Sequence, residues 1–133
     1  MECHPFLTQE LLLNFCKEKG IVLTAYSPLA RSGTSEQKSS QSPLDIPLIK
    51  DLAKKYGKTP AQICIKWQVQ RDVVVIPKSS TKERIFSNID IFGFQLTKDE
   101  LAKIDGLNQN IRSAHWSQLG ISKHKNWPFG IPY

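Results

Sequence analysis

Hydrophobic residues follow two different periods along this chain, and these periods predict two kinds of element. Residues 21–26 and 73–76 are short runs of apolar and mostly β-branched residues, which is typical of strands. The second run is uninterrupted, so it predicts a strand buried on both faces, as in a parallel sheet. Pro77 should end this strand, because proline has no N–H to donate to a neighbour.

Around these runs, apolar residues recur every three or four positions, which predicts amphipathic helices. Capping residues mark where the helices begin, and glycines mark where two of them end. The predicted N-caps are Thr8, Asp45, Thr59, Ser80 and Thr97, and the predicted ends are Gly20, Gly57, Gln70 and Leu107. The start at Thr59 has the most signals, since Gln62 completes a capping box and Pro60 takes the first helical position.

Helices separate the two predicted strands, and such crossovers join parallel strands, so the predicted fold class is α/β. Two strands cannot form a sheet that buries both faces, and residues 1–5 are too short to supply a third strand. The 133 residues therefore resemble the back portion of a larger α/β domain, since a barrel of this kind needs about 250 residues.

Composition narrows the class of protein. No apolar run approaches the roughly 20 residues of a membrane helix, and the first residues lack the features of a signal peptide, so we expect a soluble, cytoplasmic protein without a membrane partner. Cys3, Cys16 and Cys64 are widely spaced, which fits reduced thiols and supplies no metal site. The net charge of +6 favours an anionic partner, but no nucleic-acid-binding motif accompanies it.

The turn after the second strand has the composition of an anion site. It consists of Lys78, Ser79, Ser80 and Thr81, with Arg84 three residues later. A helix N-terminus, hydroxyl donors and two cations suit a phosphate at the carboxyl end of a strand. The same residues also fit a strand followed by a capped helix with solvated charges. Local composition leaves both interpretations open.

Four stretches resemble one known family in their order and spacing. They are Glu-Cys-His-Pro-Phe-Leu-Thr-Gln at 2–9, Thr-Ala-Tyr-Ser-Pro-Leu at 24–29, Ile-Pro-Lys-Ser at 76–79 and Lys-His-Lys-Asn-Trp-Pro-Phe at 123–129. These motifs resemble those of the aldo-keto reductases, a family of (β/α)8 TIM barrels. The resemblance implies that residues 1–133 are the C-terminal part of such a barrel, about units six to eight, with residues 111–133 as a substrate-loop tail.

The resemblance also implies an activity, a cofactor and a set of site residues. The family reduces small-molecule aldehydes and ketones by hydride transfer from NADPH, and we expect the complete enzyme to be monomeric. The residues that match its cofactor site are Tyr26, Ser27, Leu29, Lys78, Ser79, Ser80, Thr81, Arg84 and Asn88. Tyr26 matches the residue that stacks on the nicotinamide, and Lys78 to Thr81 with Arg84 match the 2′-phosphate site. Trp116 matches a variable position of the substrate pocket.

The family's catalytic tyrosine, its lysine and aspartate partners and its active-site histidine lie on earlier strands and have no match here. We therefore expect no catalytic residue in this chain and no activity of the chain alone. Two interpretations remain: a fragment of an NADP-dependent reductase, or a truncated, non-catalytic product that associates with another chain through its open barrel edge. Nucleic-acid binding is a third interpretation, which we disfavour.

Overall fold

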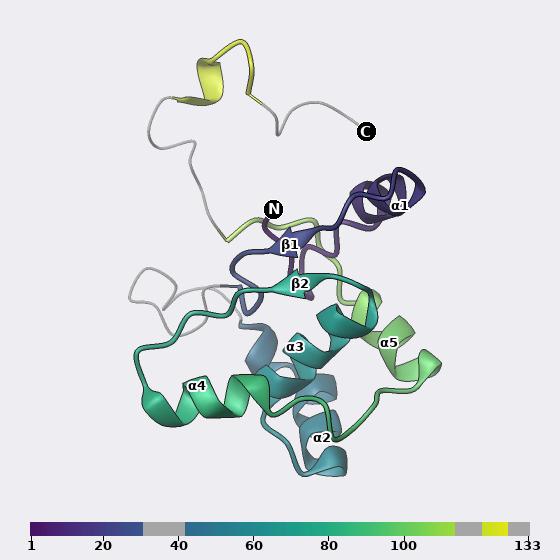
Figure 1. Cartoon of the computed structure of the whole chain (residues 1–133), viewed down its shortest axis with the longest axis vertical. Coiled ribbons are helices and arrows are strands. Elements are labelled where there is room, and N and C mark those ends of the chain that lie inside the picture. The colour runs from purple at the N-terminus through teal and green to yellow at the C-terminus, as the bar shows by residue number, and fades with distance from the viewer. Residues whose placement is uncertain (31–41, 114–120, 128–133) are drawn as a thin grey trace.

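The computed structural model of this chain describes residues 1–30, 42–113 and 121–127 (Figure 1). Two short strands lie between helices, with α1 above them in Figure 1 and α2, α3 and α4 below. The elements are α1 (Glu10–Glu18), β1 (Thr24–Ala25), a 3₁₀ turn (Pro43–Asp45), α2 (Pro47–Tyr56), α3 (Pro60–Gln70), β2 (Val74–Val75), α4 (Lys82–Ile89), α5 (Lys98–Asp105) and a second 3₁₀ turn (Ile121–Lys123). This order confirms the predicted α/β class.

β1 and β2 form a parallel pair, as the helical crossover between them predicts. The register places Thr24 opposite Val74. The ladder continues for one residue beyond the strands, because the Ile76 N–H donates to the Ala25 carbonyl at 3.3 Å. It ends before Pro77, which has no N–H to continue it. Both loops that leave the strands at their carboxyl ends therefore start at the same edge.

A third segment lies beside β1 on the side away from β2. Glu2 pairs with Tyr26 in a single parallel bridge. The Tyr26 N–H donates to the Met1 carbonyl at 2.9 Å, and the Cys3 N–H donates to the Tyr26 carbonyl at 3.4 Å. A single bridge agrees with the expectation that residues 1–5 are too short for a strand. Three parallel segments thus lie side by side.

The prediction that residues 73–76 are buried on both faces is wrong for the described chain. Val73 is 2% exposed and packs in a small cluster with Cys3, whereas Val74 is 47% and Ile76 is 57% exposed. Successive side chains of a strand point to opposite faces, so one face of the pair is covered and the other is open. Each strand is also only two residues long.

The main hydrophobic core lies between α2, α3 and α5. Its fully buried members are Ile49 from α2, Ile63, Cys64 and Trp67 from α3, and Ile104 from α5. Each such side chain contributes roughly 1.5–3 kcal/mol by leaving water. The Trp67 indole N–H donates to the Asp105 carboxylate at 3.0 Å, so burial leaves no polar atom of this ring unpaired. The helical spacing predicted for α2 and α3 is confirmed.

Two predicted capping boxes and one predicted helix end are confirmed. The Thr59 and Thr97 hydroxyls accept the N–H groups of Gln62 and Glu100, whose side chains accept the threonine N–H groups in return. Gly57 ends α2 with a φ of 61°, a left-handed conformation that glycine adopts without strain.

Three predicted N-caps are wrong by one residue. The structure places them at Gln9 rather than Thr8, at Ile46 rather than Asp45, and at Thr81 rather than Ser80. Contacts elsewhere in the fold engage two of the predicted residues. The Thr8 carbonyl accepts a hydrogen bond from the Arg71 guanidinium at 2.8 Å, and Asp45 ends the 3₁₀ turn and pairs with Lys50 at 3.1 Å.

One carboxylate connects α5 to α2. Glu100 accepts hydrogen bonds from the Lys55 ammonium at 2.6 Å, the Tyr56 hydroxyl at 2.6 Å and the Thr97 N–H at 2.8 Å. Burial raises the pKa of the Glu100 carboxyl, but these hydrogen bonds outweigh burial and lower the pKa from 4.5 to about 2. The group is therefore ionised at neutral pH, and its partners favour the folded state.

We predict that Glu100→Gln lowers the free energy of unfolding by about 1–2 kcal/mol at pH 7, since it removes charge-assisted hydrogen bonds whose lysine end is open to solvent. The difference from wild type should be complete above pH 4.5 and should shrink as the pH falls toward 2, where the wild-type carboxylate also gains its proton. Urea denaturation at a fixed protein concentration measures both effects.

The control for this prediction is Asp99→Asn, which removes an exposed acidic charge from the same turn of α5. It should change the free energy of unfolding by about 0.5 kcal/mol or less, the size of a screened interaction with the helix dipole. Equal losses in the two variants would show that Glu100 acts only through its charge on the helix.

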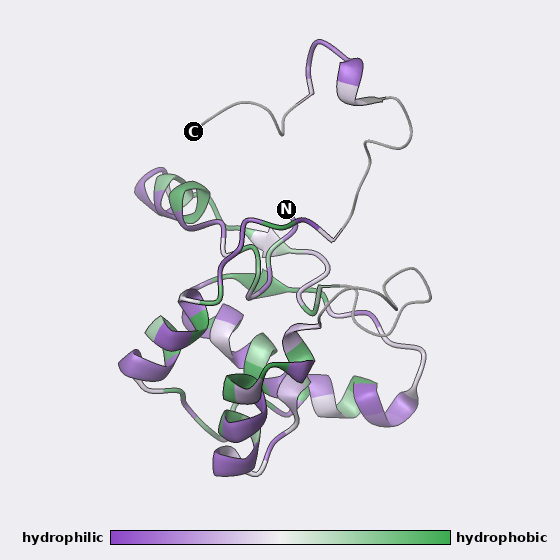
Figure 2. Ribbon diagram, turned by 180° about the vertical axis from the view of Figure 1, so that it is seen from behind, coloured by the Kyte–Doolittle hydropathy of each residue, from purple (hydrophilic) through white to green (hydrophobic). Residues whose placement is uncertain are grey.

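Large apolar side chains also lie on the surface of the described residues. Those between 47% and 73% exposed include Leu11, Phe15, Val22, Val74, Ile76, Ile85, Phe86, Ile89 and Phe92. The described helices carry hydrophilic and hydrophobic residues together (Figure 2), and none of them is both long and apolar enough to cross a membrane. The apolar faces of α1 and α4 and the open face of the strand pair are therefore free to bury further surface.

We predict that the chain of 133 residues self-associates when it is produced alone, because these apolar faces gain free energy by leaving water. Sedimentation velocity should detect oligomers whose size rises with concentration. The double variant Phe86→Ser, Ile89→Ser should reduce this association, since both side chains lie on α4. A sharp monomeric boundary with cooperative thermal unfolding would contradict the prediction.

Candidate functional site

The candidate site lies at the edge where β1 and β2 end. Tyr26 and Ser27 follow β1 directly, and Ile76, Pro77 and Lys78 follow β2. Because the two strands are parallel and adjacent, both loops begin side by side. The two loops that carry the predicted cofactor residues, 26–29 and 78–88, thus start at one edge, although about fifty residues separate them in sequence.

The loop after β1 makes a tight turn. Tyr26 is half-buried at the strand end, and Ser27 has a φ of 49°, in the left-handed region. The turn closes through a hydrogen bond of 2.9 Å from the Ala30 N–H to the Ser27 carbonyl. Leu29 packs against the main hydrophobic core and is half-buried. The turn therefore fixes Tyr26 and Ser27 at the edge and directs Leu29 toward the core.

The loop after β2 leads into α4, and the Ser79 hydroxyl forms a hydrogen bond within this loop. The Ser79 hydroxyl accepts the Thr81 N–H at 3.1 Å. Thr81 is the N-cap of α4, and its side chain makes no capping hydrogen bond within the described chain. The first N–H groups of α4 are thus left without a side-chain cap, and they carry the partial positive charge of a helix N-terminus.

Two cations flank this helix start. Lys78 precedes it and Arg84 lies in its first turn, and both side chains are exposed. Neither forms an ion pair with an acidic side chain in the part of the chain that the structure describes. Glu83 is the one acidic residue in the first turn of α4. Lys78 and Arg84 are therefore available to an external anion, which Ser80 and Thr81, both exposed, can also reach.

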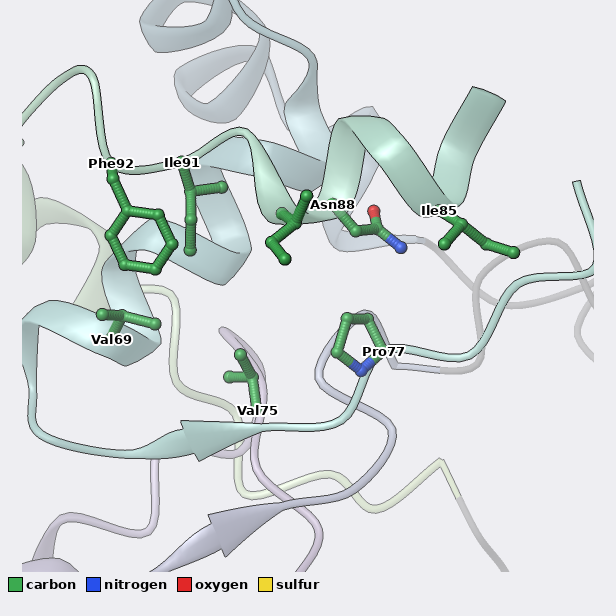
Figure 3. A pocket seen from close by; sticks show the side chains of 8 residues that line it. Val69, Val75, Pro77, Ile85, Asn88, Ile91 and Phe92 are labelled. Atoms are coloured by element: carbon green, nitrogen blue, oxygen red, sulfur yellow. The ribbon is translucent and has the colours of Figure 1, made fainter. Parts of the chain in front are cut away.

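A pocket of about 290 Å³ lies beside this loop, between β2, α3 and α4 (Figure 3). Its lining residues are Val69, Val75, Pro77, Ile85, Asn88, Ile89, Ile91 and Phe92. Asn88 contributes the one polar side chain of this lining, and Figure 3 shows it between Ile85 and Ile91 along the upper wall. An apolar pocket with a single amide suits a flat, mostly apolar group with one hydrogen-bonding edge.

The resemblance named Asn88, which lines this pocket, but the other lining residues were not predicted. Val69 lies at the end of α3, and Ile91 and Phe92 follow α4, so no single helical or strand period connects them. The apolar repeat of Ile85 and Ile89 was the available signal. It predicts a helix, and it does not reveal that this face borders a cavity.

Other predicted features lie elsewhere. Trp116 and most of the tail, 111–133, lie outside the described residues. The Tyr56 hydroxyl donates to Glu100, and this hydrogen bond raises its pKa, so the phenol is a weaker acid than an ordinary tyrosine. Among the described residues, no three His, Cys, Asp or Glu side chains gather into a group that could hold a metal ion.

Comparison with known proteins gives a consistent result. Residues 1–109 match the model of the aldo/keto reductase family. The whole chain is 45% identical to prostaglandin F synthase 1 of Bos taurus and 43% identical to estradiol 17 beta-dehydrogenase 5 of Mus musculus, and it covers 41% of each of these proteins. The chain thus spans about two fifths of the length of these relatives.

A solved structure agrees with the fold. The crystal structure of a Bombyx mori aldo-keto reductase in complex with NADP matches with a TM-score of 0.87 and 38% sequence identity. The match covers 96% of this chain and 41% of that protein. The described elements therefore have the arrangement of one part of that larger structure.

Proposed function

This chain belongs to the aldo/keto reductase family, and from that premise we propose that it is the C-terminal part of an NADP-dependent reductase. In this proposal residues 1–133 supply about units six to eight of a (β/α)8 barrel, and residues 111–133 supply the substrate-loop tail. The complete barrel reduces small-molecule aldehydes or ketones to alcohols.

The observation that carries this proposal is the anion site at the strand edge. Lys78 and Arg84 are exposed and unpaired among the described residues, and they flank a helix start without a side-chain cap. A planar guanidinium, an ammonium and hydroxyl donors together suit a dianionic phosphate. NADP carries such a phosphate on its adenosine ribose and NAD does not, so this site favours NADP.

The neighbouring features fit the rest of the same cofactor. The pocket below the loop offers apolar walls and the Asn88 amide, which suit a purine ring. Tyr26 is a half-buried aromatic ring at the adjacent strand end, where it can stack on a flat ring. When bound, NADPH supplies the hydride. The residues of this chain bind and orient it through Tyr26 and Ser27 at one end and through Lys78 to Thr81, Arg84 and Asn88 at the other. Leu29, which the resemblance also assigns to this site, supports the turn from the core side.

The general acid of the reaction is proposed to come from the part of the barrel that precedes this chain. Protonation of the developing alkoxide requires a tuned acid beside the carbonyl. Tyr56 is held by Glu100 with a raised pKa, and the match to the family gives Tyr26 a stacking role. We therefore expect residues 1–133 alone to have no reductase activity.

A second candidate is a non-catalytic product that associates with another chain. The exposed Val74 and Ile76 on the open face of the strand pair favour association, since exposed apolar strands pair readily with other chains. This candidate predicts a stable hetero-complex without carbonyl reduction. The first candidate predicts activity once a complete barrel is assembled.

We predict that Lys78→Ala and Arg84→Ala each weaken NADPH binding by about 1.5–3 kcal/mol and change NADH binding little, because each removes a charge-assisted contact to the phosphate that only NADPH carries. The test uses the assembled reductase, by which we mean a complete barrel whose C-terminal part is residues 1–133. Fluorescence titration gives the Kd of both cofactors.

Lys54→Ala is the matched control for these variants, since Lys54 is an exposed cation in the last turn of α2. It should leave both Kd values unchanged, which separates a local contact from the effect of net charge. Equal losses of NADPH and NADH affinity in the Lys78 and Arg84 variants would contradict the 2′-phosphate assignment.

We predict that Trp116→Ala changes the ratio of kcat/KM between bulky and small aldehydes by the equivalent of about 1–3 kcal/mol, because a large indole narrows an apolar pocket. The affinity for NADPH should stay nearly constant, since the cofactor contacts are assigned to other residues. Steady-state kinetics of the assembled reductase with paired aldehydes measures the ratio. A constant ratio with a weaker NADPH affinity would make Trp116 a cofactor residue instead.

A further inference from the structure

Residues 108–113, which lead into the tail, cross the N-terminal segment of the chain and form hydrogen bonds with it. The N–H groups of Gln109 and Ile111 both donate to the Phe6 carbonyl, at 3.1 and 3.2 Å. The Asn108 side-chain oxygen accepts the Thr8 N–H at 3.2 Å. Residues 108–111 are therefore attached to residues 6–8, a hundred positions earlier in the sequence.

The next contact along this crossing is a buried carboxylate. Glu2 is 1% exposed, and its Oε1 accepts the Ser113 N–H at 2.6 Å and a short hydrogen bond from the Ser113 hydroxyl. His4 Nε2 lies 3.3 Å from the same oxygen. Burial raises the pKa of Glu2, but the hydrogen bonds from His4 and Ser113 outweigh burial and lower the pKa to about 2. The carboxylate is therefore charged and faces three donors on one oxygen.

His4 orients this carboxylate. Its ring is 1% exposed and lies edge-on to Phe6, with the centroids 6.5 Å apart. Its Nε2 faces the Glu2 carboxylate, so this is the ring nitrogen that can donate to Oε1. Nδ1 has no hydrogen-bond partner among the described residues. The histidine thus presents one ring nitrogen to the carboxylate.

The backbone of Glu2 makes a second connection, to the cofactor end of the candidate site. Glu2 pairs with Tyr26 in a parallel bridge, and the residues on either side of Glu2 form hydrogen bonds with the Tyr26 backbone. One residue therefore holds Ser113 by its side chain and lies against Tyr26 by its backbone.

We propose that Glu2 is a positioning residue that holds Ser113 at the strand edge beside Tyr26, and that this anchor supports the binding of the carbonyl substrate. This inference rests on the proposed function, because it concerns the substrate side of the same site. Glu2 does not touch the reacting atoms. It acts through Ser113, and its loss should affect substrate binding more than hydride transfer or cofactor binding.

The test compares two variants of Glu2 in the assembled reductase. Glu2→Ala removes the acceptor, and it should raise the KM of a bulky aldehyde about tenfold, while kcat changes about threefold or less and the Kd of NADPH about twofold or less. Glu2→Gln keeps an acceptor oxygen of the same reach, so it should restore most of the loss. A merely structural role predicts that KM, kcat, Kd and the thermal midpoint all change together, which would overturn the proposal.

Two further variants keep the test decisive if Glu2→Ala folds poorly. Ser113→Ala removes the hydroxyl and keeps the N–H donor, so it should raise the same KM by about threefold. Asp51→Asn removes an exposed acidic charge from α2 and should leave all the constants unchanged. If Glu2→Ala is unfolded and KM is unchanged in both Ser113→Ala and Glu2→Gln, then Glu2 contributes only to folding. That outcome overturns the proposal.

Hydrogen exchange provides a readout that does not depend on catalysis. The Ser113 amide should exchange about tenfold faster in Glu2→Ala than in wild type, because its acceptor is gone, and the Asp51→Asn control should not change it. Unchanged exchange at Ser113 overturns the proposal whatever the kinetics. If the assembled protein binds no NADPH and reduces no carbonyl, the proposed function is wrong, and exchange at Ser113 still decides whether Glu2 anchors the tail.

Discussion

The parallel pairing of β1 and β2 is the constraint on which the candidate site depends. Parallel strands end at the same edge, and the register of Thr24 with Val74 brings the loop at Tyr26 beside the loop at Lys78. The pairing requires a crossover, which α2 and α3 supply, and their burial of Ile49, Ile63 and Trp67 holds that crossover in place. The loop Lys78–Thr81 is therefore positioned by a core to which it contributes no buried residue.

Sequence reasoning predicted the parts of this fold in which local signals agree with each other. Thr59 and Thr97 have reciprocal partners in Gln62 and Glu100, and both became capping boxes. The pair Ser80 and Glu83 has the same spacing, yet α4 starts one residue later. The difference is physical: Ser79 uses its hydroxyl for the Thr81 N–H, which extends the loop by a residue before the helix begins.

The sequence could not predict features that depend on distant contacts. The run 73–76 predicts two buried faces, and the covered face is right, but Val74 and Ile76 are 47% and 57% exposed on the other face. The pocket walls at Val69, Ile91 and Phe92 come from three segments without a common period. Local composition placed Lys78 and Arg84 at a strand end and a helix start, and the motifs of the family added Asn88. Only the fold relates these residues to the pocket.

Glu2 and Glu100 are chemically similar carboxylates whose different positions in the fold give them different roles. Both are buried by their surroundings, both accept at least three hydrogen bonds, and both have a pKa of about 2. Glu100 connects two helices that share one core, so its partners stabilise packing that exists without it. Glu2 connects a strand edge at Tyr26 to Ser113 at the start of the tail, and these two parts share no hydrophobic cluster among the described residues. Loss of Glu100 therefore lowers the stability of the fold, whereas loss of Glu2 releases Ser113 from the strand edge beside Tyr26.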